Sequence, residues 1–585
     1  MLRDWASTTY FCQIIEAILT GIIFAVAFAA PRAGSRLFGR AERLLGQLAR
    51  RPRQTTIGIV AAIIVARLCL LALVPVPEPS IHDEFSYLLA AKTFAAGRLT
   101  NSPDPFWRHF ESVHILQHPT YMSMYAPGQG LALAAGLWAT GKAWSGVVVS
   151  VALLGGAVFW ALSGWFPGRW ALAASMLAAV RWLLLSYWMN SYWGGALPAL
   201  GGALIFGSVP RLARNANVRH ALILALGVIL LANTRPFEGL VISSISLVLM
   251  IAWSKQSGTL HRLYRPGLIL PVVSILVLSA GAMLYYNSRV TRDPFTLPYV
   301  EDRREYAIAP LFIWGHLRPE PAYATESLRA VYVAEADLYR TARCDFGIPE
   351  LFRKLKNFWI FFLGPLLSVP LVAYTFALKR KDAGEEQRIA RYVGAIALAM
   401  LVAAAQVVWF YPHYFAPAFA PFVGMLLLGF RELRRWRWRT REIGLFLSRA
   451  IPIGCVLMAS IPASAHRLGW RLSFWPLQWA LGSPAEIQGP KVKSSVLSEG
   501  KKAIVFVEYG EKHDPGFEWV YNEPDIQDAR IIWARRVNPK SDAALMRRFR
   551  DRSIWILRPD ENPAVLIRVQ PPDGRLGQIS LNSIW

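Results

Sequence analysis

Long apolar runs recur along this chain, and they constrain its fold more than any other feature. The apolar residues form blocks, not the one-sided stripes that mark the surface helices of soluble proteins. A helix of about 20 apolar residues spans the ~30 Å hydrocarbon core of a bilayer. With 54% hydrophobic and only 17% charged residues, the composition also lies outside the range of ordinary soluble domains. The sequence therefore predicts an all-α polytopic membrane protein with about 12 transmembrane helices.

The predicted spans follow directly from these runs, although 221–232 is short for a span. They comprise residues 10–29, 56–76, 144–166, 170–188, 192–209, 221–232, 240–253, 268–286, 358–378, 392–410, 415–430 and 443–463. We interpret 10–29 as a retained helix, because it lacks the strongly basic start and the clear cleavage site of a signal peptide. Glu16, Arg67 and Arg181 fall within spans, which predicts functional or pairing roles. The alternative for the two arginines is that they snorkel to the membrane surface.

Basic residues gather in alternate loops of this arrangement. The clusters contain Arg32, Arg36, Arg40, Arg43, Arg50, Arg51 and Arg53; Arg211, Arg214 and Arg219; Lys379, Arg380 and Lys381; and Arg431, Arg434, Arg435, Arg437, Arg439 and Arg441. By the positive-inside rule these loops are cytoplasmic, so both termini are predicted to be extracytoplasmic. The net charge of +25 is then mostly a topology signal and an attraction to anionic headgroups, which argues against a nucleic-acid partner.

Three regions are predicted along the chain. Residues 1–55 form an extra helix and a basic cytoplasmic loop, and residues 56–463 form the main membrane domain with outer loops at 77–128 and 287–356. Residues 464–585 change character, with strand-like runs at 503–509, 530–535, 553–557 and 564–569 and a helical stretch at 541–550. This pattern predicts a small extracytoplasmic α/β domain.

The first outer loop is the most informative stretch. It begins Ser80-Ile-His-Asp-Glu-Phe, and the acidic pair Asp83 and Glu84 starts a helix whose Phe85, Leu88 and Leu89 share one face. We expect this helix to lie along the membrane interface, where a carboxylate can take a proton from an incoming hydroxyl. The alternative is that Asp83 simply caps the helix.

This loop resembles the first outer loop of the GT-C glycosyltransferases, which include protein O-mannosyltransferases and aminoarabinose transferases. The similarity rests on the acidic pair, the Tyr-Leu-Leu-Ala helix that follows it, Gly97-Arg98, and the stretch from Tyr125 to Gly130, which has one proline where those families have two. The resemblance implies a polyprenyl-phosphate sugar donor, Asp83 as general base with Glu84 as neighbour or second candidate, and a bacterial inner membrane.

The same loop holds a possible metal site. If the stretch is helical, Glu111, His114 and His118 share one face and could hold a metal ion. The alternative is that these side chains bind headgroups or fold the loop. The resemblance to mannosyltransferase-like members implies no metal, so we predict no cofactor and keep a divalent metal as the alternative.

Polar residues at other outer helix ends are predicted to join Asp83. Arg235, Arg289 and His413 could bind a donor phosphate through charge-assisted hydrogen bonds. The alternative for Arg235 is an ion pair with Glu238, three residues further on. The predicted substrate pocket is lined by Tyr87, His109, Glu111, His114, Tyr121, Tyr125, Gln129, Asn190, Tyr192, Trp193, Glu238 and Tyr414.

Together these features predict a membrane glycosyltransferase that moves a sugar from a polyprenyl-phosphate donor to an extracytoplasmic acceptor hydroxyl, with inversion. Its partners would be the lipid-linked donor, a lipid, glycan or protein acceptor, and membrane lipids. The alternatives are a lipid-linked sugar flippase or transporter, and a surface-polysaccharide polymerase or ligase. A transporter should bind its substrate at the bilayer midplane, whereas the polar groups here gather at one face.

Overall fold

The computed structural model describes residues 10–380, 384–465, 484–511, 513–514, 516–561, 564–569 and 577–580. In this part of the chain, ten helices are long and apolar enough to span a membrane. They are α2 (Phe11–Ala29), α4 (Pro52–Cys69) with its 3-10 extension η1 (Leu70–Ala72), α8 (Trp144–Ser163), α10 (Ala196–Arg214), α12 (Pro236–Gln256), α13 (Pro266–Thr291), α17 (Gly364–Lys379) with the preceding α16 (Ile348–Phe358) and π-helix η5 (Trp359–Leu363), α18 (Glu385–Gln406), α19 (Phe419–Leu433) with the preceding η7 (Ala416–Ala418), and α20 (Ile443–Ala465). The chain is an all-α polytopic membrane protein, as predicted.

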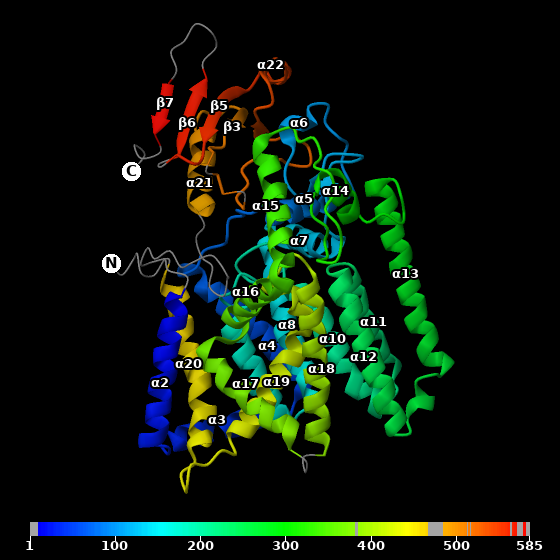
Figure 1. The fold of residues 1–585 in the computed structure, drawn as a ribbon, viewed down its shortest axis with the longest axis vertical. Helices are drawn as coiled ribbons and strands as arrows, with labels where there is room; N and C mark the ends of the chain where they lie inside the picture. Colours follow the sequence, from blue (N-terminus) through cyan, green and yellow to red (C-terminus); the bar gives the residue numbers. More distant parts are fainter. Residues whose placement is uncertain are drawn as a thin grey trace.

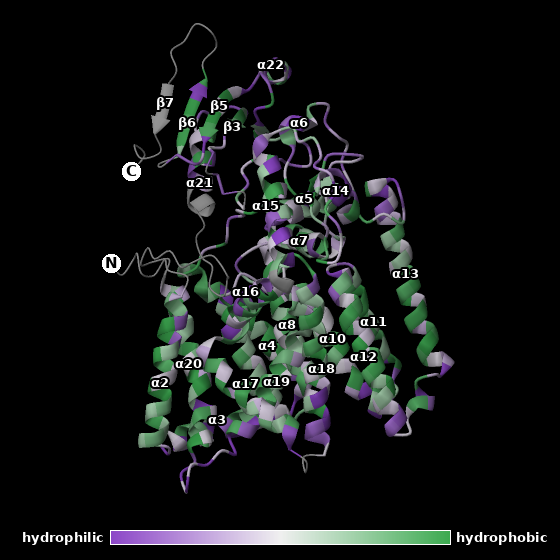
Figure 2. Ribbon diagram, viewed as in Figure 1, coloured by the Kyte–Doolittle hydropathy of each residue, from purple (hydrophilic) through white to green (hydrophobic). Residues whose placement is uncertain are grey.

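Every predicted span falls on a helix, but two are shorter than a membrane crossing. The short α11 (Val218–Ala232) has 15 residues. The other, α9 (Gly168–Ala178), has 11 residues and continues into a π-helix, η2 (Ala179–Leu183). The apolar bundle and its polar ends are clear in Figure 2.

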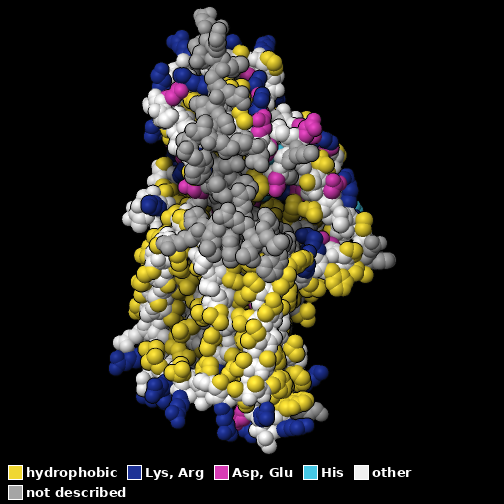
Figure 3. All heavy atoms as spheres, turned by 90° about the vertical axis from the view of Figure 1, so that its left-hand side faces the viewer, with side chains coloured by type: hydrophobic (Ala, Val, Ile, Leu, Met, Phe, Trp, Pro, Cys, Tyr) yellow, Lys and Arg dark blue, Asp and Glu magenta, His cyan; other side chains and the backbone are white. Residues whose placement is uncertain are grey.

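The two ends of the bundle differ in charge. Basic side chains crowd the lower end (Figure 3), where α3 (Ser35–Leu48) also lies (Figure 1). Glu42 of α3 accepts hydrogen bonds from Arg434 and Arg449, which joins the first and last basic clusters. The outer loops and the C-terminal domain lie at the opposite end. This segregation agrees with the predicted orientation, and the assignment of the lower end to the cytoplasm stays a prediction.

A buried ion pair fastens α2 to the bundle. Arg181, in η2, donates to both carboxylate oxygens of Glu16 at 3.1 Å and to the carbonyl of Leu363 at 3.0 Å. Arg67 is equally buried and donates to the carbonyls of Val74 and Pro75. Both arginines therefore bond inside the protein, and the snorkelling alternative is wrong.

Glu16→Gln is expected to lower the free energy of unfolding by about 3 kcal/mol, because Arg181 would keep a buried charge beside a weaker partner. Thermal unfolding in detergent measures the effect. Glu385→Gln is a matched control, since Glu385 is 61% exposed in its ion pair with Arg214 and a surface ion pair contributes about 1 kcal/mol or less. Equal losses in the two variants would contradict the prediction.

The C-terminal domain has one five-stranded sheet in the order β4-β3-β5-β6-β7. The first three of these strands are parallel to one another, and β6 and β7 join antiparallel. Its elements are α21 (Pro484–Leu497), β3 (Ala503–Val507), β4 (Ile531–Arg535), α22 (Pro539–Arg548), β5 (Ser553–Arg558), β6 (Val565–Val569) and β7 (Gly577–Ser580). The four predicted strands and the predicted helix are confirmed, whereas α21 and β7 were not predicted. Residues 466–483 lie outside the described residues.

The outer loops form a layer between the bundle and this domain (Figure 1). The layer contains α5 (His82–Ala95), α6 (Trp107–Phe110), the hairpin of β1 (Ile115–Leu116) and β2 (Met122–Ser123), α7 (Pro127–Thr140), α14 (Pro298–Tyr306) and α15 (Glu326–Arg343). The C-terminal domain packs on α5, where Tyr521 stacks on Phe85 at 4.7 Å between ring centroids and Asp525 pairs with Arg98. Because α7 packs on α5 as well, α5 is buried along most of its length. It is therefore enclosed by protein, and the expected position along the lipid interface is wrong.

Candidate active site in the first outer loop

Two adjacent carboxylates at the start of α5 have different surroundings. Glu84 accepts hydrogen bonds from the backbone N–H of Ser80 at 3.0 Å and of Ile81 at 3.4 Å, and its other oxygen accepts from the N–H of Tyr192 at 2.8 Å. Glu84 thus caps the helix and holds a distant loop. The alternative that Asp83 is the cap is wrong, and the candidacy of Glu84 as a catalytic group gives way to a structural role.

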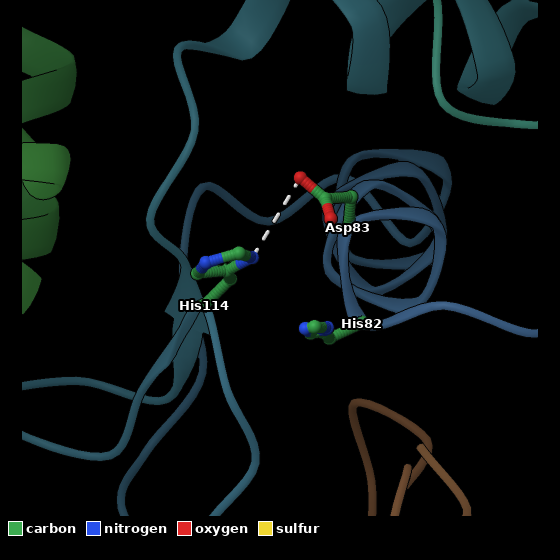
Figure 4. A group of neighbouring side chains, drawn as sticks. All are labelled: His82, Asp83 and His114. Carbon is green, nitrogen blue, oxygen red and sulfur yellow. Dashed lines mark ion pairs between the residues drawn. The ribbon is translucent and has the colours of Figure 1, made fainter. Parts of the chain in front are cut away.

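Asp83 points instead toward side chains of the β1–β2 region (Figure 4). Tyr125 donates its hydroxyl hydrogen bond to Asp83 Oδ1. His114 Nδ1 lies 3.1 Å from the same hydroxyl and 3.7 Å from Asp83 Oδ1. The Asp83 side chain keeps 16% of its surface exposed, so the carboxylate can still meet a ligand.

The predicted metal ligands Glu111, His114 and His118 do not share a helix face. Helix α6 ends at Phe110, and His114 has a left-handed backbone with φ 65°, which no α-helix contains. Glu111 accepts a hydrogen bond from Tyr306 at 3.1 Å, and the His118 ring packs on Trp107. This metal site is therefore excluded.

A different trio could hold a metal ion. Ligand atoms of His82, Asp83 and His114 lie within 4.8 Å of one another. The two imidazoles, however, stack face to face with an interplanar angle of 6°, and Asp83 Oδ1 already accepts from Tyr125. Imidazole nitrogens bind metals in the plane of the ring, so parallel rings do not converge on one ion. In this arrangement the residues do not fit a metal.

Arg235 approaches Asp83 from the start of α12. Its guanidinium lies 4.3 Å from the ring centroid of Tyr414, and its Nη1 lies 3.7 Å from Glu238 Oε1. The predicted pair with Glu238 is present, but at a distance longer than a hydrogen bond. The charge of Arg235 acts on both Asp83 and His413, lowering the pKa of each alongside larger effects. The charge of Arg235 thus reaches both groups.

His413 lies on the 3-10 turn η6 (Pro412–Tyr414) and is buried. Its Nδ1 is 2.9 Å from the hydroxyl of Tyr187, and its ring lies 4.8 Å from that of Trp193. Burial and then the charge of Arg235 lower the pKa of His413 well below its ordinary value. His413 is therefore a neutral hydrogen-bonding group at physiological pH.

A hollow opens beside Arg235. Its lining comprises Tyr87, Ala126, Gln129, Trp193, Gly194, Gly195, Pro198, Thr234 and Arg235. Ala126, Gly195 and Arg235 are the residues that precede α7, α10 and α12. The positive ends of three helix dipoles therefore meet at the hollow. Gly195 has φ 115°, and a Cβ there would lie 2.4 Å from Trp188, so only glycine fits this turn.

Several predicted pocket residues serve other contacts. His109 bonds Arg535 and Ser541 of the C-terminal domain, and the hydroxyl of Tyr121 donates to the carbonyl of Asn522. Asn190 accepts from Arg67 at 2.9 Å. With Glu111, these residues fold the loops, and we remove them from the predicted pocket. Tyr192 stays at the border, where its carbonyl accepts from Gln129.

Arg289 is exposed on α13, which stands at the edge of the bundle (Figure 1). Helix α13 packs mainly against α11, with a smaller contact to α14. The structure therefore does not bring Arg289 together with Arg235, and its predicted phosphate contact is not supported. Sequence position placed Arg289 at the correct end of the bundle but could not show which helices are central.

The structure adds residues that sequence reasoning missed. The charge of Arg303, on α14, contributes to lowering the pKa of His114. Its contribution is smaller than those of burial and of His82. Tyr299 lies one turn earlier on α14. It contributes to raising the pKa of Tyr414, and the charge of Arg235 acts to lower the pKa of Tyr299. Tyr187 was not predicted, although it falls in the same stretch as the predicted residues Tyr192 and Trp193. Nothing in the spacing of α14 pointed to the site.

Comparison with known proteins found no matching family model and no matching curated protein. Among solved structures, the chain is similar to ArnT from Cupriavidus metallidurans at 12% identity, over 86% of this chain and 92% of that one, with a TM-score of 0.48. One structure of that protein is bound to undecaprenyl phosphate. The chain is also similar to the oligosaccharyltransferase of Archaeoglobus fulgidus at 11% identity, over 86% and 67% of the two chains, with a TM-score of 0.48. At these identities the likeness concerns the course of the chain, and it assigns no substrate.

Proposed function

We propose that this protein is a GT-C-type membrane glycosyltransferase that transfers one sugar from a polyprenyl-phosphate donor to an acceptor hydroxyl on the extracytoplasmic side. The observation that carries the proposal is that Asp83, a partly exposed carboxylate, is bonded to Tyr125, whose ring stacks on Tyr87, and Tyr87 lines the same hollow as the guanidinium of Arg235. A base on one side and a cation on the other suit a displacement that releases an anionic leaving group.

The donor phosphate would bind beside Arg235. A guanidinium forms forked hydrogen bonds with phosphate oxygens. The three helix N-termini at the hollow add positive potential, which favours the same anion. Neutral His413, which packs against Trp193 of the lining, would supply a hydrogen bond without changing the charge of the site. The aromatic faces of Tyr87 and Trp193 at the lining suit stacking against a sugar ring.

The reaction would be a single displacement. Asp83 removes the proton from the acceptor hydroxyl as the hydroxyl oxygen forms a bond to the anomeric carbon. The bond between that carbon and the phosphate oxygen breaks, and the electron pair leaves with the lipid phosphate, which Arg235 stabilises. One displacement inverts the anomeric configuration. The test is transfer of a labelled sugar from polyprenyl phosphates to candidate acceptors by the purified protein in lipid.

A transporter is the second candidate, and the position of the site separates the two. Arg235 and Gly195 immediately precede spanning helices, so the hollow lies at the N-terminal ends of α10 and α12 and not at their middle. An alternating-access site is expected near the middle of the spans. Flipping of labelled donor in proteoliposomes without any acceptor would favour the transporter, whereas sugar transfer without flipping favours the enzyme.

Removal of divalent metal ions is expected to leave sugar transfer unchanged, because the stacked rings of His82 and His114 do not converge on an ion. Dialysis against a chelator, followed by activity and metal-content measurements, checks this. Stoichiometric metal in the purified protein, together with activity that is lost on chelation and restored by the metal, would contradict the prediction.

A further inference from the structure

A pair of serines ties the hairpin of β1 and β2 to α5. The hydroxyls of Ser86 and Ser123 lie 2.7 Å apart, and Ser86 lies 2.7 Å from the carbonyl of His114. Ser123 also accepts from the N–H of Tyr125 at 3.1 Å. Ser86 is one helical turn after Asp83, so these bonds fix the backbone of His114 and Tyr125 relative to that carboxylate.

His114 holds an uncommon backbone conformation at this point. Its φ of 65° lies in the left-handed region, which costs a residue with a Cβ about 1 kcal/mol or more. The conformation turns its imidazole toward Tyr125, with Nδ1 3.1 Å from the hydroxyl. The ring of Tyr87 stacks on the ring of Tyr125, with 4.4 Å between the two centroids. Tyr125 is therefore held from two directions.

The order of donors along this line can be deduced. An ionised carboxylate only accepts hydrogen bonds, so the single hydroxyl proton of Tyr125 is donated to Asp83 Oδ1. The Tyr125 oxygen can then only accept from His114, which requires the tautomer with hydrogen on Nδ1. The line runs from His114 N–H to the Tyr125 hydroxyl to Asp83.

We propose that Tyr125 and His114 are positioning residues for Asp83: Tyr125 binds Oδ1, His114 holds the Tyr125 hydroxyl in place, and Oδ2 is left as the oxygen that meets the acceptor hydroxyl. This inference rests on the proposed function. It also assigns Tyr125 the second task of keeping Asp83 ionised, because a hydrogen bond donated to a carboxylate favours its charged form.

The electrostatics of the site support this assignment. Burial raises the pKa of Asp83, but the adjacent imidazoles of His114 and His82, the hydrogen bond from Tyr125 and the charge of Arg235 outweigh it, so the pKa stays below its ordinary value. The pKa of His114 is lowered to about 3, mainly by burial. Above that pH the ring is neutral, so its charge no longer acts on Asp83 and it acts on the line through its hydrogen bond alone.

Tyr125→Phe tests the inference, because it removes one hydroxyl and keeps the ring. Loss of the hydrogen bond raises the pKa of Asp83, so the carboxylate becomes protonated at a higher pH than in the wild type. Activity that needs the ionised carboxylate is then lost at that higher pH. We expect the acid limb of the pH–rate profile to move to higher pH and kcat to fall about 10-fold, with a smaller change in KM for the donor. Tyr121→Phe is the matched control, since that buried hydroxyl bonds Asn522 and not Asp83.

Two substitutions of His114 test its role, one that keeps its hydrogen bond and one that removes it. Asparagine tolerates the left-handed backbone and places an N–H where Nδ1 lies, so His114→Asn is expected to keep the acid limb of the wild type. His114→Ala loses both features and should shift the limb in the direction of Tyr125→Phe. Identical profiles for these two His114 variants would overturn the role of His114.

Infrared titration of the carboxyl stretch separates failure of this inference from failure of the proposed function, with Asp83→Asn as the spectral blank. A raised Asp83 pKa in Tyr125→Phe, in a protein without any transfer activity, would retain the positioning and overturn the glycosyltransferase. An unchanged Asp83 pKa and an unchanged acid limb in Tyr125→Phe would overturn the positioning even where transfer is confirmed.

Discussion

Asp83→Asn is expected to reduce sugar transfer by about 10³-fold, within the range for loss of a general base. Asparagine retains an oxygen that can accept from Tyr125, so the fold of the loop should persist while the proton acceptor is lost. Donor binding should remain close to that of the wild type, because Arg235 and the helix N-termini are unchanged. Single-turnover transfer of a labelled sugar and a separate donor-binding measurement distinguish the two effects.

Glu84→Gln is the instructive comparison for this experiment. Its carboxylate accepts from three backbone N–H groups, so the variant should unfold at a lower temperature while its folded molecules keep activity close to that of the wild type. The base assignment fails if Asp83→Asn transfers sugar at the normal rate, or if Glu84→Gln is the variant that loses turnover at full stability.

Arg235→Gln is expected to have the second-largest effect, a loss of about 10²-fold in kcat/KM, because the departing phosphate loses its guanidinium. Arg235→Lys should be intermediate, since an ammonium keeps the charge and loses the forked geometry. Binding of a fluorescent polyprenyl phosphate should weaken in the same order. Rates of transfer and binding constants at several salt concentrations measure both consequences.

Two variants make this prediction specific. Arg235→Gln leaves the buried carboxylate of Glu238 beside the phosphate site, so the double change with Glu238→Gln removes that repulsion and isolates the guanidinium. Arg289→Gln removes an exposed arginine from α13, and it should leave donor binding unchanged. A loss of donor binding in Arg289→Gln equal to that in Arg235→Gln would contradict the assignment of the phosphate to Arg235 and not to Arg289.

The candidate site was predicted in part, and the reasons differ from residue to residue. Asp83, Arg235 and His413 could be placed at one end of the bundle because each directly follows or precedes an apolar run. Tyr125 and Gln129 were included because their stretch resembles the segment that precedes the next spanning helix in GT-C glycosyltransferases. Glu84 could not be separated from Asp83, because neighbouring acids on a helix start look alike until their hydrogen-bond partners are known.

His109, Glu111 and Tyr121 show the opposite error. Their loop contains polar groups and lies at the correct end, yet these side chains contact the C-terminal domain or α14. Those partners lie roughly 200 to 430 residues further along the chain. No local sequence pattern indicates such a contact, because the residues around each partner would look the same if its side chain faced solvent.

By itself, the sequence determined that this chain crosses a membrane many times, which loops carry the positive charge, and that a small sheet domain follows the bundle. These features depend on the length of apolar runs, the positions of charged residues and the alternation of apolar and polar residues, all of which are local. The membrane selects for the first two independently of how the helices pack. Which polar groups meet could be seen only from the way the helices pack. The tertiary structure assigned Glu84 to a backbone cap, aligned His114 and Tyr125 with Asp83, and brought three helix starts to Arg235, because such contacts depend on the packing of distant helices.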